Sequence, residues 1–187
     1  MPGRDRHPTI GFNAMTAGFR YAIFDTDMGW IGVLGSAAGL RRVTLPKRSA
    51  EDACQLLCVD DAVDSPSLFE DLIRRFRVYF SGHEVTFSDQ LDLAGTTGFQ
   101  QRVWATTKLI PYGTTRSYRW VARQIGQPDA ARAVGQALAK NPLPIIIPCH
   151  RVVASHGQLG GYSGGVTTKQ RLLSLESSGG TGLPDYS

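Results

Sequence analysis

The sequence is poor in cysteine and lacks long apolar runs. Three cysteines among 187 residues are too few, and odd in number, for a disulfide framework of the kind that stabilises small secreted proteins. No apolar stretch approaches the roughly 20 residues that a membrane-spanning helix needs. Residues 1–24 interleave charged and apolar side chains and contain no apolar core of a secretory signal. These absences predict a soluble cytoplasmic protein with at least one free thiol.

Acidic residues are scarce in the second half of the chain. Residues 1–95 carry ten Lys and Arg against thirteen Asp and Glu, whereas residues 96–187 carry ten against three, so the net charges are −3 and +7. A basic surface gains affinity for nucleic acids by releasing counterions from phosphates. The asymmetry favours a nucleic-acid partner for the second half, although basic segments also occur in proteins that do not bind DNA.

The length suits one large domain or two small ones. A hydrophobic fraction of 42% with 19% charged residues is typical of a globular protein. The character of the chain changes at Gly95, where an α+β pattern gives way to a mostly helical one. We therefore expect an N-terminal α+β domain over 1–94, a C-terminal domain over 95–178 and a flexible tail over 179–187.

The first half has the pattern of a small α+β unit. Three short apolar runs are strand-like, and the first two are joined by Asp27-Met28-Gly29, which suits a hairpin. Ser49 stands where a helix cap is expected, Ser65-Pro66 starts the second helix, and Gly82 follows that helix as a stop signal. We expect a three-stranded sheet with helices, built from strands over 21–26, 30–34 and 40–45, helices over 49–58 and 65–79, and one more strand over 85–93.

The second half is predicted to be mostly helical. Ser117 is a suitable cap for a short helix that Gly126 ends, and Pro128 stands at the start of the next helix. Two short helices joined by a glycine-containing turn form the helix-turn-helix pattern of DNA-binding proteins. The apolar run from Pro144 to Pro148 indicates a short buried strand or extended segment. The expected helices cover residues 99–110, 117–125, 129–140 and 166–177.

Cys149 and His150 follow this apolar run directly. A cysteine reacts as its thiolate, and a nearby imidazole favours thiolate formation. Adjacent side chains do not readily point at one another, so a proton transfer between these two needs a bridging water. The alternative is a buried structural cysteine beside a surface histidine. The pair by itself leaves both interpretations open.

The helix expected over 129–140 carries small side chains on one side. Ala130, Ala133, Val134 and Ala137 share that side, whereas long polar side chains that read bases in the major groove are few. Small residues let a helix approach the narrow minor groove closely. The same alanines equally suit packing against a protein core, and the pattern alone does not decide between the two.

A series of motifs occupies the stretch from Phe99 to Glu176. In chain order these are Phe99-Gln-Gln-Arg-Val-Trp104, Pro111-Tyr-Gly113, Ser117-Tyr118, Ala130-Ala-Arg-Ala-Val-Gly135, Asn141-Pro142, Ile147-Pro-Cys-His-Arg-Val152 and Gly161-Tyr-Ser-Gly-Gly165. They closely resemble the O6-alkylguanine-DNA alkyltransferases, whereas the first half matches that family only loosely. The resemblance implies an α/β (α+β) fold, with a ribonuclease H-like sheet domain followed by a winged-helix-like domain that holds the helix-turn-helix.

The resemblance also implies direct-reversal DNA repair. Cys149 would take the alkyl group from O6-methylguanine, and from O4-methylthymine, in one irreversible displacement. His150 would remove the thiol proton through a water, Glu176 would orient the imidazole, and Tyr118 would donate to the departing guanine. A thioether, unlike a thioester, is not hydrolysed by water, so each molecule would act once.

For DNA binding, the family implies the minor groove of double-stranded DNA, without sequence specificity, and a flipped base. Arg132 would fill the space that the flipped O6-alkylguanine leaves, and Asn141 would tie the helix to the reactive cysteine. Ser163 would hydrogen-bond O6. The other implied DNA contacts are Ser117, Ala130, Ala131, Ala133 and Gly135, and the other pocket residues are Pro144 and Tyr162. We expect no cofactor, no metal, no membrane contact and no obligate protein partner.

Two other functions compete with alkyl transfer. A thiol hydrolase would need an oxyanion hole and a distant histidine, and it would turn over on acyl substrates. A non-catalytic helix-turn-helix damage sensor would bind DNA without chemistry, but the presence of Cys149 argues against it. Cys54 and Cys58, four residues apart, suit a metal or a disulfide, but with no second ligand pair they are better explained as buried core. We expect His7, His83 and His156 at the surface.

Overall fold

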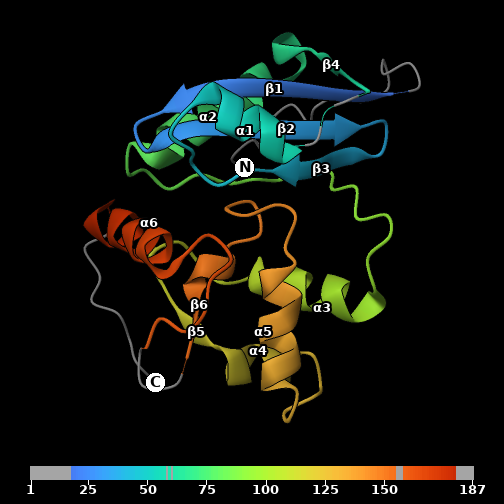
Figure 1. The fold of residues 1–187 in the computed structure, drawn as a ribbon. Helices are drawn as coiled ribbons and strands as arrows, with labels where there is room; N and C mark the ends of the chain where they lie inside the picture. Colours follow the sequence, from blue (N-terminus) through green and yellow to red (C-terminus); the bar gives the residue numbers. More distant parts are fainter. Residues whose placement is uncertain (1–17, 58, 60, 155–157, 180–187) are drawn as a thin grey trace, which may run out of the picture. The chain divides into compact units, whose positions relative to one another are not determined.

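The computed structural model describes residues 18–57, 59, 61–154 and 158–179 (Figure 1). Its contacts divide the chain into two units, which we describe separately. The first contains the described residues up to Phe76 together with Thr86–Asp92, and the second contains Arg77–Val85 and the described residues from Leu93 onward. The predicted domain limits, 1–94 and 95–178, stay a prediction, from which this division differs by assigning Arg77–Val85 to the second unit.

The first unit is built on a sheet of four strands, β1 (Phe19–Thr26), β2 (Gly29–Ser36), β3 (Gly39–Val43) and β4 (Ala62–Asp64). Their order is β3-β2-β1-β4, with β4 parallel to β1 and the other pairs antiparallel. The predicted hairpin joins β1 to β2. Gly29 is required there, because its φ is +125° and a Cβ would lie 2.5 Å from the Lys47 carbonyl oxygen.

Two predictions for this sheet are wrong. The sheet has four strands rather than three, and β4 escaped prediction because its three side chains are half-buried or exposed and show no alternation. The segment 85–93 is not a strand. Only its Leu91 pairs, in an isolated bridge to Leu40, whose N–H and C=O bond to Gln90 and Asp92. Alternation marks a face of an extended segment but does not supply a partner strand.

The two helices predicted for the first half are present. α1 (Ala50–Leu57) packs on β2 and begins where predicted, since Ser49 Oγ accepts a hydrogen bond from Asp52 N at 3.1 Å. The second helix opens with the 3₁₀ turn η2 (Pro66–Phe69) and continues as α2 (Glu70–Phe80). Phe76 of α2 packs against Phe24 of β1, with the rings tilted by 42° and their centroids 5.8 Å apart.

The second unit is mostly helical, and the whole chain is therefore the mixed α/β protein that the sequence predicted. The Thr97–Gln100 capping box starts α3, and Ser117 Oγ caps α4 by accepting from Trp120 N. These helices and the closing one lie where predicted. The elements are α3 (Gly98–Thr107), β5 (Arg116–Ser117), α4 (Tyr118–Gln124), α5 (Ala131–Ala139), η3 (Cys149–Arg151), β6 (Val152–Val153) and α6 (Val166–Gly179), with β5 parallel to β6.

The helix predicted over 129–140 begins two residues later. Ala130 N donates to Gln127 O at 2.9 Å, which closes a turn with Pro128 at its second position. Proline is preferred at that position of a β-turn, so it precedes α5 instead of opening it. At the other end of the chain, α6 includes Gly179, the first residue of the predicted tail. The rest of that tail lies outside the described residues.

The apolar run 144–148 is buried as predicted, but it is not extended. Ile145 and Ile146 form a tight turn between Pro144 and Ile147, which pair in an isolated bridge, and Ile145 has φ +76°. Asn141 stabilises the turn, because its Oδ1 accepts from Leu143 N and its Nδ2 donates to Ile147 O. The turn delivers Cys149 to the start of η3. Among the described residues, no helix has the length and apolar character to cross a membrane.

Candidate active site

Cys149 is a buried thiol held by an amide and facing a phenol. Only 4% of the residue is exposed. Asn141 Nδ2 donates to its Sγ at 3.2 Å, and Tyr162 Oη lies 3.9 Å from Sγ. Burial raises the pKa of the thiol, and the contacts with Asn141 and Tyr162 and the charge of Lys169 offset this only in part. The thiol is therefore neutral at rest, and its reaction as a nucleophile requires a base.

His150, the next residue, is completely buried and bonded to a carboxylate. Its Nε2 lies 2.7 Å from Glu176 Oε1 on α6. Burial would raise the pKa of Glu176, but the hydrogen bond to His150 and the hydrogen bonds and charge of Arg151 bring it to about 2. Burial lowers the pKa of His150. An ionised glutamate therefore faces a neutral imidazole.

This pairing fixes which ring nitrogen of His150 carries the proton. A carboxylate accepts hydrogen bonds only, so Nε2 must be the protonated nitrogen. Nδ1 then has a free lone pair, and it is buried without a hydrogen-bond partner among the described residues. His150 is not hydrogen-bonded to Cys149. The ring thus presents an unprotonated nitrogen that is able to accept a proton.

Glu176 also binds three groups to which sequence reasoning gave no role. Arg151 donates to both carboxylate oxygens, with Nε 2.9 Å from Oε2 and Nη2 3.0 Å from Oε1. Gly113 N donates to Oε2 at 3.1 Å. Tyr79 Oη donates to Oε1 at 2.7 Å from the last turn of α2. Arg151 and Gly113 stand inside recognised motifs, which was a usable signal, whereas Tyr79 had the helical spacing of an ordinary core aromatic.

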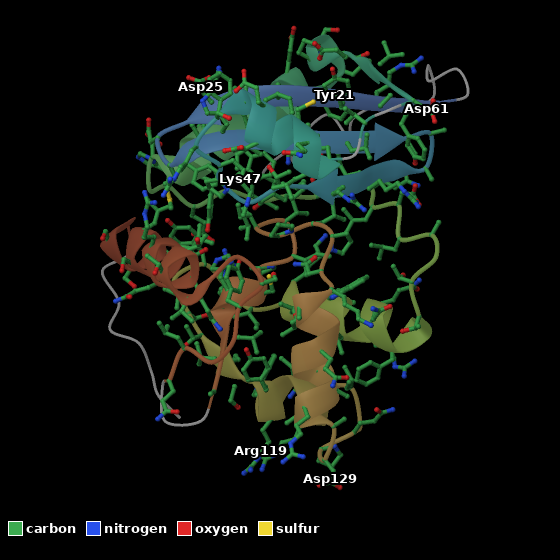
Figure 2. All side chains as sticks on the ribbon, in the orientation of Figure 1. Tyr21, Asp25, Lys47, Asp61, Arg119 and Asp129 are labelled. Atoms are coloured by element: carbon green, nitrogen blue, oxygen red, sulfur yellow. The ribbon has the colours of Figure 1, made fainter. Side chains whose placement is uncertain are left out.

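A pocket of about 770 Å³ opens beside the thiol. Of the predicted site residues, it is lined by Tyr118, Ala131, Arg132, Gly135, Cys149, Tyr162 and Ser163. The pocket also includes Arg119, which sequence reasoning did not single out and whose side chain extends outward from the ribbon in Figure 2. Predicted residues that are not among its lining are Ser117, Ala130, Ala133, Asn141, Pro144, His150 and Glu176.

Tyr118 lies across the pocket against the glycine-rich loop. Its Oη donates to Gly161 O at 3.2 Å. A Cβ on Gly160 would lie 3.2 Å from the same hydroxyl, and Gly160 has φ +65°, so glycine is needed there. Burial, followed by the nearness of Cys149, raises the pKa of Tyr118. In the resting site the phenol is therefore protonated and able to donate a hydrogen bond.

Lys169 on α6 is a buried cation that was not predicted. Its Nζ donates to Val152 O at 2.6 Å and to Leu159 O, and it lies over the rings of Tyr118 and Tyr162 at 5.7 and 5.8 Å. Burial lowers its pKa to about 8, although Cys149 acts in the opposite direction. A lysine on a closing helix usually reaches solvent, which is why the sequence gave no signal. Here it ties both pocket tyrosines to β6.

Helices α4 and α5 expose cations and small residues next to the pocket. Val134 and Ala137 of α5 are buried, so core packing explains them, whereas Ala130 and Ala133 are half-buried. Arg119, Arg123 and Arg132 are exposed, and no described residue forms an ion pair or hydrogen bond with their guanidinium groups. Unpaired guanidinium groups are the side chains best suited to contact phosphates.

The remaining cysteines and histidines form no site in the described part of the chain. Within it, no three His, Cys, Asp or Glu side chains gather as a metal site would require. Cys54 is a free, half-buried cysteine on α1, and His83 is exposed as predicted. Cys58, His7 and His156 lie outside the described residues.

Comparisons with known proteins agree with this arrangement. The family model "6-O-methylguanine DNA methyltransferase, DNA binding domain" matches residues 98–178. The methylated-DNA–protein-cysteine methyltransferase of Mycobacterium tuberculosis is 41% identical over 84% of this chain and 92% of its own length. The protein of the same name from Methanosarcina acetivorans is 40% identical over 84% of this chain and 98% of its own.

Solved structures match as well. A crystal structure of Mycobacterium tuberculosis OGT in complex with DNA superposes with a TM-score of 0.74 at 40% identity, covering 85% of this chain and 93% of that one. The O6-methylguanine-DNA methyltransferase of Pyrococcus kodakaraensis superposes with a TM-score of 0.68 at 27% identity, covering 83% and 98%. Both likenesses extend well beyond the helical half, to which the sequence motifs were confined.

Proposed function

Because the chain belongs to the methylated-DNA–protein-cysteine methyltransferase family, we propose that it repairs DNA by moving the methyl group of O6-methylguanine, and of O4-methylthymine, onto Cys149 Sγ. The observation that carries this proposal is the state of the site. A neutral thiol at the wall of a pocket stands next in sequence to a neutral imidazole whose Nε2–H is fixed by an ionised carboxylate. That arrangement suits a proton transfer coupled to attack by sulfur.

The proposed step balances as a displacement. The S–C bond forms while the O6–C bond breaks, and the bonding electrons leave with the guanine. The thiol proton passes through one water to Nδ1 of His150, and the guanine takes a proton at N3 from Tyr118. The imidazolium then returns a proton to the tyrosinate through solvent. Glu176 acts on His150 as a positioning residue, and its negative charge stabilises the imidazolium while it exists.

A substrate base must leave the duplex to reach this thiol. Sulfur cannot approach O6 of a stacked base, and Cys149 is 4% exposed. We assign Arg132, exposed at the pocket, to the space that the flipped base leaves. The α5 residues lining the pocket include Ala131, Gly135 and Ala139, whose small size suits a minor groove entered without sequence preference. Arg119, exposed on α4, suits a phosphate beside the flipped nucleotide.

We also propose a more specific fold for each of the two units. The four-stranded sheet with helices supports a ribonuclease H-like first unit. The α4–α5 pair with the short β5–β6 ladder supports a winged-helix-like second unit. We keep the domain limits 1–94 and 95–178, and we assign the remaining predicted contacts, Ser117, Ala130, Ala133, Asn141, Pro144, Tyr162 and Ser163, to DNA or to the guanine pocket.

The deciding experiment is a mass measurement. The chain is mixed with duplex DNA that holds one O6-methylguanine, and intact and peptide masses are recorded. We expect one methyl group on the Cys149 peptide, saturating at one per molecule. Cys149→Ser should gain none, and the control Cys54→Ser should behave as the wild type. Repeated turnover, methylation elsewhere, or DNA binding without transfer would exclude this function, and turnover on acyl substrates would favour a thiol hydrolase.

A further inference from the structure

Tyr79 brings a hydroxyl group from the first half of the sequence to the His150–Glu176 pair. The residue is 1% exposed, and its ring packs edge-on against Phe80 and Tyr112 at 5.2 and 6.1 Å between centroids. Its Oη donates to Glu176 Oε1 at 2.7 Å and lies 3.3 Å from His150 Nε2. The hydroxyl thus contacts both partners of the pair that the proposed mechanism uses.

The phenol is a permanent donor in this position. Burial and the adjacent charge of Glu176 raise the pKa of Tyr79 well above its ordinary value, so the hydroxyl does not ionise. Because Glu176 accepts the hydroxyl proton, the oxygen of Tyr79 presents a lone pair toward the Nε2–H of His150. The carboxylate and the phenol oxygen therefore act together as acceptors around one N–H.

The two oxygens of Glu176 are held from different sides. Oε2 is held by Gly113 N and Arg151 Nε, whereas Oε1, the oxygen that faces His150, receives donors from Arg151 and Tyr79. Of the groups on Oε1, only the hydroxyl of Tyr79 also reaches the imidazole. Its removal would leave Nε2–H with a less firmly placed acceptor, while the salt bridge to Arg151 would persist.

We propose that Tyr79 is a positioning residue for alkyl transfer, whose hydroxyl fixes Glu176 Oε1 against His150 Nε2 and so keeps Nδ1 unprotonated. The inference rests on the proposed function. An imidazole in the other tautomer carries its proton on Nδ1 and cannot accept one from the thiol. The first half of the sequence then contributes a group to the chemistry and does not serve as support alone.

The test compares Tyr79→Phe with Tyr112→Phe. Tyr79→Phe keeps the ring and its packing and removes only the hydroxyl. Tyr112 is a matched control, because its hydroxyl is buried near the same carboxylate yet has no hydrogen-bond partner among the described residues. We expect Tyr79→Phe to lower the rate constant of methyl transfer at saturating DNA about ten- to a hundredfold, the range typical when a metal-binding histidine loses an outer hydrogen-bond partner. DNA affinity should stay within about twofold of wild type for both variants.

A spectroscopic measurement tests the same idea without activity. Nitrogen-15 spectra of histidine-labelled wild-type protein should show His150 in the Nε2–H tautomer, with a slowly exchanging Tyr79 hydroxyl proton close to that N–H. Tyr79→Phe should shift the His150 nitrogens toward a mixture of tautomers, and Tyr112→Phe should not. If Tyr79→Phe does not fold, the wild-type spectrum alone tests the expected tautomer of His150.

Different experimental results would refute the proposed function and the proposed role of Tyr79. A wild-type chain that transfers no methyl group would refute the proposed function, while the spectra would still report the tautomer. A wild-type chain that transfers normally, with Tyr79→Phe equally fast or equal losses in both variants, would overturn the role of Tyr79. A loss confined to DNA affinity, or a wild-type His150 protonated on Nδ1, would overturn it as well.

Discussion

Replacing Glu176 by glutamine should change how the stability of the protein depends on pH. The carboxyl has an ordinary pKa of 4.5 and a folded-state pKa of about 2, held there against burial by His150 and Arg151. The unfolded chain therefore binds a proton more tightly than the folded one, and the ionised group stabilises the fold above pH 4.5. That stabilisation is lost as the pH falls through 4.5 toward 2.

The size of the effect follows from the pKa difference. A shift from 4.5 to about 2 corresponds to about 3 kcal/mol, of which about 2 kcal/mol is lost between pH 5.5 and pH 3. Glutamine keeps the shape but cannot titrate. Urea unfolding at these two pH values should therefore show a smaller decrease in the free energy of unfolding for Glu176→Gln than for the wild type, by at most about 2 kcal/mol, because the variant also removes the carboxylate that raises the pKa of buried His150.

The absolute stability of Glu176→Gln should also fall. The variant leaves the buried guanidinium of Arg151 without its counter-ion, a change that typically costs about 3–5 kcal/mol. The control is Glu84→Gln, which removes an exposed carboxylate and should leave the free energy of unfolding within about 0.5 kcal/mol of the wild type. If Glu176→Gln lost as much stability as the wild type between pH 5.5 and 3, the carboxylate would not be the anchor that the contacts describe.

Two further predictions concern the pocket. Arg132→Ala should slow methyl transfer from duplex DNA about ten- to a hundredfold, because the flipped state loses a side chain that offsets an unstacking cost of a few kcal/mol. The rate of transfer from a free O6-benzylated guanine should fall much less. Equal falls in rate on both substrates would contradict the role assigned to Arg132. Gly160→Ala should slow transfer by displacing the Tyr118 hydroxyl, 3.2 Å from the new Cβ. The control Gly82→Ala also places a side chain at a positive φ, but its Cβ meets only Leu175, at 3.8 Å. Thermal melts should therefore show a similar loss of stability in both variants, whereas transfer assays should show a loss of rate in Gly160→Ala alone.

The elements that could be predicted from the sequence are those whose ends are set locally. Ser117 and Thr97 cap α4 and α3 through hydrogen bonds to residues three positions along, and such signals are readable in a single sequence. β4 and the isolated bridge of Leu91 depend on strands more than forty residues away. The turn at Ile145 depends on the side chain of Asn141 and on a positive φ. An isoleucine in the sequence does not predict a positive φ, because β-branched residues rarely adopt one.

The same distinction holds for the site. The motif around Cys149 marked the thiol and His150, and the resemblance extended this to Glu176, which the structure brings to 2.7 Å from the imidazole. Tyr79 and Lys169 were missed because an aromatic at helical spacing and a lysine on a helix have ordinary explanations. Only tertiary packing brings Tyr79, 97 residues before Glu176 in sequence, to its carboxylate.

The burial of Cys149 has a consequence for how long a molecule stays useful. Under the proposed chemistry each molecule reacts once, so any stray electrophile that reaches the sulfur ends its working life. A thiol that is 4% exposed and whose pKa is raised by burial presents little surface and little thiolate to small alkylating agents. The same burial that makes a base necessary for repair therefore protects the unreacted protein from inactivation by stray electrophiles.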